Sequence, residues 1–105
     1  MVDQGLISIL ENNFQLSELN SQLDTESEYF KYLQMKLAEK IKFFIRTDLD
    51  KLLQILYRID LPQSDTDNAF DLGEIGAVSS DLAEKIIHRQ LKKIQYAKEF
   101  YNKDK

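Results

Sequence analysis

The sequence predicts an all-α protein, a small bundle of three to four helices, on three observations. The 105 residues include three glycines and one proline, so few tight turns interrupt the chain. Leucine, lysine, glutamate and glutamine, which favour helices, are abundant. Apolar residues recur at spacings of three and four positions, the period of an amphipathic helix. We expect a long N-terminal helix, a short central helix and a C-terminal amphipathic helix.

Size and composition predict a single helical domain over residues 1–105. The apolar share of 43% is ordinary for a globular protein of this length. The absence of cysteine excludes disulfides, thiolate metal sites and cysteine nucleophiles. No segment approaches the length of a membrane span, and the N-terminus lacks the basic region and apolar core of a signal peptide. We therefore expect a soluble protein of the cytoplasm.

The charged residues alternate in sign along the chain. The net charge is −6 over residues 1–30, +4 over 31–58, −7 over 59–84 and +5 over 85–105, which leaves −4 overall. Acidic residues before a helix and basic residues towards its end complement the helix dipole. The pattern is therefore typical of helices preceded by acidic segments.

The long N-terminal helix has two candidate starts. One third of a helical wheel contains Phe30, Leu33, Leu37, Ile41, Phe44 and Ile45. Thr25 and Glu28 fit a capping box that would begin the helix there. Alternatively, Ser17 caps one helix that runs to about Arg46, because a heptad-like alternation continues upstream through Leu16, Leu19 and Leu23. Residues 17–46 are thus either one helix or two.

A short central helix is predicted over residues 47–60. Thr47 with Asp50 forms a second capping signature, so the chain should turn near Arg46. Pro62 ends this helix, because proline disfavours helical geometry in the preceding residue. Well over half of the helix circumference is apolar, through Leu49, Leu52, Leu53, Ile55, Leu56, Tyr57 and Ile59. Such a helix is expected at the centre of the bundle.

The acidic stretch "SDTDNAFDLGEIG", residues 64–76, has the residue types of a calcium loop. An EF-hand loop needs oxygen ligands at positions 1, 3 and 5, glycine at position 6 and glutamate at position 12. Counted from Asp65, position 5 is Ala69, position 6 is Phe70 and position 12 is Gly76. The loop signature therefore fails, and we expect no metal.

The alternative for this stretch is an acidic connector over residues 61–79. Ser64 and Asp67 fit an N-terminal capping pair for a short helical turn. Gly73 can supply the left-handed residue that closes such a turn. The stretch is thus predicted to link the central helix to the last one.

The C-terminal helix is predicted to begin at a cap on Ser79 or Ser80. Its buried face is expected to comprise Ala83, Ile86, Ile87, Leu91, Ile94, Ala97 and Tyr101. The opposite side carries a basic cluster that could contact phosphate, formed by Lys85, Arg89, Lys92 and Lys93. This cluster supports an alternative function, a nucleic-acid-associated helper. The chain's pI of about 4.9 and its three arginines argue against that alternative.

Residues for catalysis or cofactor binding are not recognisable. The only histidine, His88, has no second histidine or cysteine as a metal partner and no serine in a nucleophile elbow. Gly5, Gly73 and Gly76 match neither nucleotide-binding fingerprint. We therefore predict a protein that is not an enzyme and that has no cofactor and no small-molecule substrate.

A second stripe on the long helix, away from its core face, predicts a partner surface. The stripe consists of Tyr29, Tyr32, Lys36 and Phe43. Two apolar stripes on one helix favour a second contact surface, and a two-fold homodimer is the simplest case. Alternatively the N-terminal segment, residues 1–16, is a short helix that folds over the stripe rather than a mobile arm. We predict a non-enzymatic protein-protein interaction or scaffold protein, a homodimer or a complex subunit.

The segments "FIRTDLDKLLQILYRIDLP" and "LAEKIIHRQLKKI", within residues 43–95, resemble a small uncharacterised family of all-helical cytoplasmic bacterial proteins. The resemblance implies an all-α fold. It implies no activity, cofactor or site residue.

Overall fold

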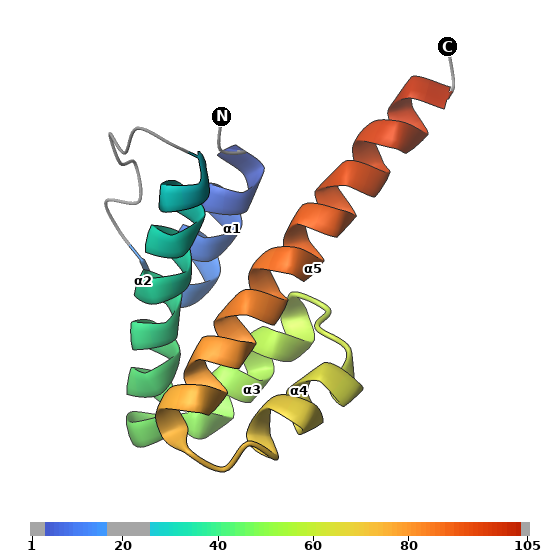
Figure 1. The fold of residues 1–105 in the computed structure, drawn as a ribbon. Coiled ribbons are helices and arrows are strands. Elements are labelled where there is room, and N and C mark those ends of the chain that lie inside the picture. Colours follow the sequence, from blue (N-terminus) through green and yellow to red (C-terminus); the bar gives the residue numbers. More distant parts are fainter. Residues whose placement is uncertain (1–3, 17–25, 104–105) are drawn as a thin grey trace.

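A computed structural model describes residues 4–16 and 26–103, and within these residues the chain forms five α-helices (Figure 1). The helices are α1 (Gln4–Phe14), α2 (Glu26–Thr47), α3 (Leu49–Arg58), α4 (Gln63–Phe70) and α5 (Ile75–Lys103). The all-α fold class is confirmed. The described part contains more helices than the three to four that were predicted, because the N-terminal segment and the connector between the central and C-terminal helices are themselves helical.

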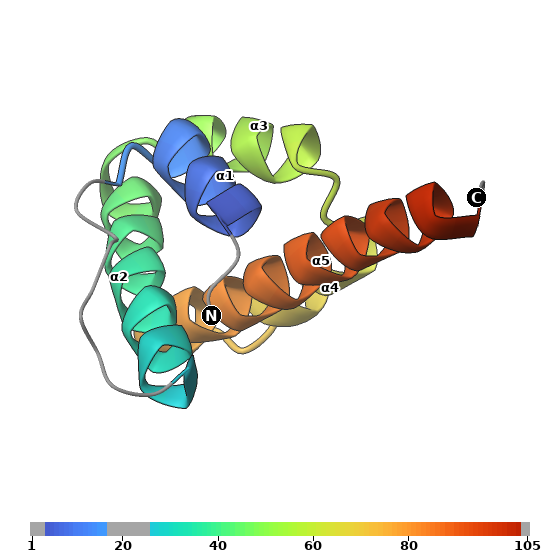
Figure 2. The same ribbon diagram turned by 90° about the horizontal axis from the view of Figure 1, so that it is seen from above.

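The two long helices α2 and α5 form the frame of the fold (Figures 1 and 2). Helix α1 packs against both of them, α4 packs against α5, and α3 packs chiefly against α2. The C-terminal turns of α5 extend beyond the other helices. The prediction that the helix at 47–60 is central is wrong, because α5 has this position and α3 lies at an edge of the bundle.

The core is built from the apolar faces of the helices. Side chains with no exposed surface include Leu6, Leu10, Phe14, Leu33, Leu37, Ile41, Leu52, Leu82, Ala83 and Ile86. These residues confirm the core faces predicted for α2 and for the first half of α5. Ala97, also predicted for the buried face of α5, is exposed because α5 has left the bundle there. Tyr101 lies outside the residues whose side chains are described.

The corner between α2 and α3 lies where the sequence predicted a turn. The cap of α3 is Asp48, whose Oδ1 accepts a hydrogen bond from the Lys51 backbone N–H at 3.2 Å. The predicted cap, Thr47, is the last residue of α2, and its Oγ1 donates to the Phe43 carbonyl at 2.8 Å. Thr47 cannot cap α3, because its hydroxyl is directed back along α2. The starts predicted at Ser17 and Thr25 lie outside the described residues.

Helix α3 ends in a Schellman motif. The Leu61 N–H donates to the Leu56 carbonyl at 3.0 Å, and the Asp60 N–H donates to the Tyr57 carbonyl at 3.1 Å. Asp60 adopts the left-handed conformation that this motif requires, with φ of 64°. From α5, the buried Gln90 side chain donates through Nε2 to the Ile59 carbonyl at 2.9 Å. The end of α3 is thus fixed both by its own backbone and by α5.

The predicted acidic connector is largely helical. Helix α4 begins at Gln63 with Pro62 at its N-cap, and no side chain caps it, so the capping pair predicted for Ser64 and Asp67 is wrong. Instead, the Asp67 carboxylate accepts a hydrogen bond from the Gln63 side chain at 2.9 Å. Gly73 follows α4 with φ of 83°, the left-handed conformation expected of this glycine.

Helix α5 begins earlier than the sequence predicted. The Glu74 carboxylate accepts hydrogen bonds from the backbone N–H groups of Gly76 and Ala77, each at 2.9 Å. These bonds hold the pKa of Glu74 below its ordinary value, since they stabilise the charged form. The caps predicted at Ser79 or Ser80 are wrong, because Glu74 satisfies the first free N–H groups one turn upstream.

Candidate protein-interaction surface

Tyr29 does not lie on the exposed surface that the sequence predicted. It is 5% exposed and belongs to the apolar core. Burial raises the pKa of Tyr29, and Tyr32 and Glu11 of α1 raise it further. Helix α1 packs against α2 in this structure, as the alternative prediction for the N-terminal segment proposed. Exposure of Tyr29 is therefore a wrong prediction.

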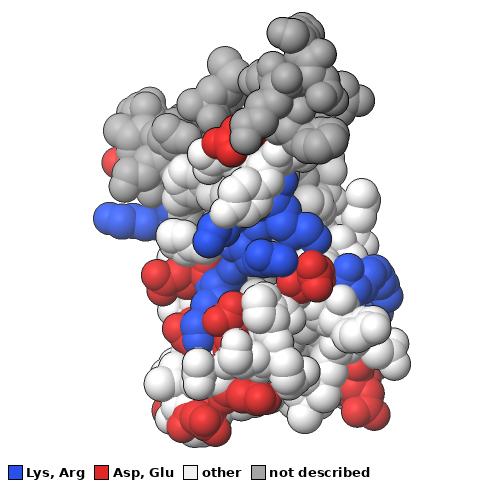
Figure 3. All heavy atoms as spheres, turned by 90° about the vertical axis from the view of Figure 1, so that its right-hand side faces the viewer, with Lys and Arg blue, Asp and Glu red and all other residues white. Residues whose placement is uncertain are grey.

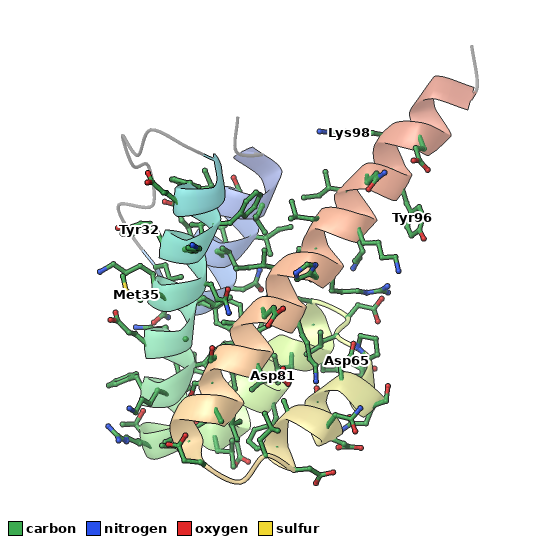
Figure 4. The ribbon with its side chains drawn as sticks, in the orientation of Figure 1. Tyr32, Met35, Asp65, Asp81, Tyr96 and Lys98 are labelled. Carbon is green, nitrogen blue, oxygen red and sulfur yellow. The ribbon has the colours of Figure 1, made fainter. Side chains whose placement is uncertain are left out.

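The other three residues of the predicted stripe are separated along α2. Tyr32 lies on the side of α2 that faces away from α5, with the Lys36 Nζ 5.8 Å from its ring centroid (Figure 4). Both side chains are partly exposed. Phe43 is 53% exposed and lies eleven residues further on, roughly 16 Å along the helix axis. The structure therefore does not bring the four residues together as one patch.

A different apolar surface lies on α3. Leu49, Leu53 and Tyr57 are 40%, 41% and 88% exposed. They are spaced four residues apart, so they follow one line along the helix. We call these three residues the α3 stripe. Helix α3 lies at an edge of the bundle (Figure 2). The exposure of the three side chains shows that the stripe is not covered by the other described helices.

The inner side of α3 already accounts for its packing against the bundle. Its buried residues are Leu52, Ile55 and Leu56, and Ile59 at its C-cap is also buried. One helix face of this size is sufficient for a core contact. The sequence signal for the α3 stripe was the wide apolar circumference of this helix. That signal was interpreted as a central position, although it equally fits a helix with one core face and one outer contact face.

Polar groups flank the α3 stripe on one side. Asp50 lies in the first turn of α3, and Arg58 is in the last turn, and both are exposed. The Arg58 Nη1 lies 3.5 Å from the Asn13 Oδ1 of α1, a long contact at the surface. The third charged residue of the helix, Lys51, places its Nζ 5.6 Å from the ring centroid of Phe44 on α2. Lys51 is therefore engaged towards α2, while Asp50 and Arg58 are directed to solvent.

The four basic residues predicted to contact phosphate lie together on α5 but are largely paired. Figure 3 shows Lys and Arg side chains gathered in a band, with Asp and Glu side chains beside it. The Lys85 Nζ lies 2.7 Å from the Asp81 carboxylate, and the Arg89 Nη2 lies 3.2 Å from that of Asp60. The Lys93 Nζ is 3.9 Å from the same Asp60 oxygen. These ion pairs reduce the positive potential that the sequence suggested.

A shallow hollow of about 570 Å³ lies beside this basic band. Its lining includes Asp65 of α4 and Lys85, His88, Arg89 and Lys92 of α5. The Lys85 Nζ also donates to the Asp65 carbonyl at 3.3 Å. Within the described residues, no three histidine, aspartate or glutamate side chains come close enough together to hold a metal ion. The hollow is therefore a polar surface with mixed charge.

A second hollow of about 410 Å³ lies between α2 and α5. Lys42 of α2 and Ser79 of α5 are among its lining residues. Ser79 is 2% exposed, and among the described residues its Oγ is the buried side-chain polar atom that has no hydrogen-bond partner.

The described residues thus define a small all-helical protein with an apolar stripe on its edge helix and an ion-paired basic face. No described helix is both long enough and apolar enough to cross a membrane. Searches of protein-family models, curated proteins and solved structures found no match for this chain. The resemblance to a bacterial protein family and the cytoplasmic location stay predictions.

Proposed function

We propose that this protein is a non-enzymatic protein-protein interaction or scaffold protein, a homodimer or a complex subunit, that docks through the α3 stripe. The observation that carries the proposal is the exposure of Leu49, Leu53 and Tyr57 on one line. Single exposed apolar residues are common on protein surfaces, but an aligned group is typical of a contact site. Aromatic residues are also enriched where proteins bind each other, and Tyr57 is 88% exposed.

The α3 stripe is held in place before any partner binds. Asp48 caps the start of α3, and the Schellman motif closes its end. The buried residues Leu52, Ile55 and Leu56 attach the helix to the bundle. A surface that is already ordered loses little conformational entropy on binding, so more of the contact energy appears as affinity.

A pair of matched substitutions tests the proposal. Leu53→Glu places a charge within the α3 stripe, whereas Leu72→Glu places the same charge on an exposed leucine outside α3. We expect Leu53→Glu to abolish association with other proteins, whether measured as self-association or as affinity capture from the source cell, and Leu72→Glu to retain it. Circular dichroism establishes that both variants are folded. Identical association of the two folded variants would refute the proposed docking surface.

The alternative function, a nucleic-acid-associated helper, is favoured by the band of basic side chains on α5. Arg89 and Lys92 line the hollow beside that band. The ion pairs to Asp60 weigh against this alternative, because they neutralise part of the charge that phosphate would meet.

Gel retardation of DNA and RNA at low salt tests the alternative. Binding that weakens steeply with added salt is expected, together with loss of binding on charge reversal at Arg89 and Lys92. Asp60→Asn removes the carboxylate that pairs with Arg89 and Lys93, so this variant should bind more tightly than the unchanged protein. Absence of retardation at low salt, for the unchanged protein and for Asp60→Asn, excludes the alternative.

A further inference from the structure

We infer that the partner of the α3 stripe is the same stripe of a second copy, with the two α3 helices antiparallel about a two-fold axis near Leu53. The inference rests on the proposed function, because it names the occupant of the surface proposed there. Two observations carry it: the symmetric spacing of the stripe and the placement of opposite charges at the two ends of its flank.

The spacing of the stripe suits a two-fold contact. Leu49 and Tyr57 each lie four residues from Leu53, so each is about 6 Å from it along the helix axis. An antiparallel two-fold arrangement places Leu53 against the partner's Leu53, and Leu49 against the partner's Tyr57. The small leucine on one helix then meets the large tyrosine on the other, twice. A two-fold interface requires such self-complementarity, because each patch contacts a copy of itself.

The charges on α3 select the antiparallel direction. Asp50 and Arg58 lie on the same flank of the stripe, near opposite ends of the helix. An antiparallel pair therefore sets Asp50 against the partner's Arg58 and repeats the contact on the other side of the axis. A parallel two-fold pair would place this flank of the two copies on opposite sides of the interface, so Asp50 and Arg58 would not meet. The antiparallel direction also opposes the two helix dipoles favourably.

Neither flanking charge has a close ionic partner within the described part of its own chain, where the ion pairs lie around Asp60 and Asp81. Among the described residues Arg58 contacts Asn13 at 3.5 Å, and its guanidinium has further N–H donors. Lys51 is engaged with the Phe44 ring, so it does not compete for the partner's Asp50. The charge arrangement on α3 is thus complementary to itself.

The contact is small, so we expect a weak dimer. Three side chains per subunit form its apolar part, whereas stable interfaces bury about 800 Å² on each partner. A dissociation constant on the order of 10–100 µM is consistent with this size. Sedimentation equilibrium of the full chain between about 5 µM and about 500 µM covers that range.

Two charge-reversal variants test the arrangement. Asp50→Arg creates two repulsive contacts with the partner's Arg58, and Arg58→Asp creates two repulsive contacts with the partner's Asp50. We expect each variant alone to dimerise at least about tenfold more weakly than the unchanged protein. An equimolar mixture of the two should associate again, because each contact in the mixed dimer joins opposite charges. Glu39→Arg, an exposed reversal on α2, is the matched control and should leave dimerisation unchanged.

The outcomes separate this inference from the proposed function. Recovery of the dimer only in the mixture supports the antiparallel α3 contact, since loss of folding in either variant cannot be restored by mixing. A monomer at every concentration overturns the inference, and so does a dimer that both reversals leave unchanged. The proposed function survives these results if capture of another protein still depends on Leu53 and not on Leu72. It fails if that dependence is absent.

Discussion

Leu52 and Leu53 are neighbours in the sequence, but the structure buries the first and exposes the second. Leu52 has no exposed surface, and Leu53 is 41% exposed. Truncating each leucine to alanine therefore measures which side of α3 faces the core. A helix at the centre of the bundle, as the sequence predicted, would bury both residues and make both substitutions costly.

The expected magnitudes follow from burial. Leu52→Ala removes a fully buried side chain and leaves a cavity, which costs about 3 kcal/mol of unfolding free energy, within the usual range of about 2–5 kcal/mol. Leu53→Ala loses only partial contact, and solvent fills the space that it leaves. The loss there is about 1 kcal/mol or less, since alanine also has the higher helix propensity. The difference of about 2 kcal/mol corresponds to a shift of about 10 °C in Tm for a domain of this size.

Urea and thermal denaturation, followed by circular dichroism, measure both quantities. A protein concentration of about 5 µM, below the expected dissociation constant, keeps self-association from contributing to the unfolding free energy. Equal losses for the two variants would contradict the reasoning, because Leu53 would then be as buried as Leu52. The α3 stripe and the functions proposed for it would fall with that result.

Three further predictions concern α5 and the turn before it. Ser79→Ala removes a buried hydroxyl without a partner, so it should raise the unfolding free energy by about 1 kcal/mol in urea denaturation; a decrease would show that the Oγ has a partner. Glu74→Gln should lower Tm at pH 7. Because the pKa of Glu74 is lowered in the folded state, the stabilisation by its charged carboxylate is present above the unfolded-state pKa and disappears as the pH falls below about 4. A difference in Tm between Glu74→Gln and the unchanged protein that persists at lower pH would contradict the cap. Gly73→Ala should lower the unfolding free energy in urea denaturation by about 1 kcal/mol, because Gly73 has a φ of 83°, and Gly73→Asn should lower it less. An added Cβ would contact nothing within 4 Å, so the cost should be purely conformational, and equal losses for the two variants would contradict this.

The parts of the fold that sequence could predict depend on helical periodicity. Leu33, Leu37 and Ile41 share one side of α2 at any helical geometry, and so do Ala83 and Ile86 on α5, so their burial was predictable. The corner near Arg46 was also predictable, because capping residues mark it on a local scale. These features require no knowledge of how the helices are arranged.

The helix starts were predicted less well, because several local signatures compete. Ser79 and Ser80 have the preferred residue type for an N-cap, yet α5 begins before them. Glu74 caps instead, and its longer side chain reaches two backbone N–H groups. Residue preference alone could not identify this cap, since it depends on how Gly73 turns the chain.

The exposure of Tyr29 was predicted wrongly for a related reason. The exposure of Tyr29 depends on where α1 packs, and the local pattern of α2 contains no information on that position. The breadth of the apolar surface on α3 was visible in the sequence, but it does not distinguish a helix enclosed by its own chain from one with an open face. Only the arrangement of the helices shows that Leu49, Leu53 and Tyr57 are exposed.

Gln90 has a consequence for the specificity of helix packing. It is 3% exposed among the apolar side chains of α5, and its amide has one acceptor, the Ile59 carbonyl. If α5 slid along the bundle by one turn, about 5.4 Å, apolar contacts could re-form, but the amide would be buried without its acceptor. That misalignment costs about 1–3 kcal/mol, so a single glutamine distinguishes one longitudinal register from its near equivalents.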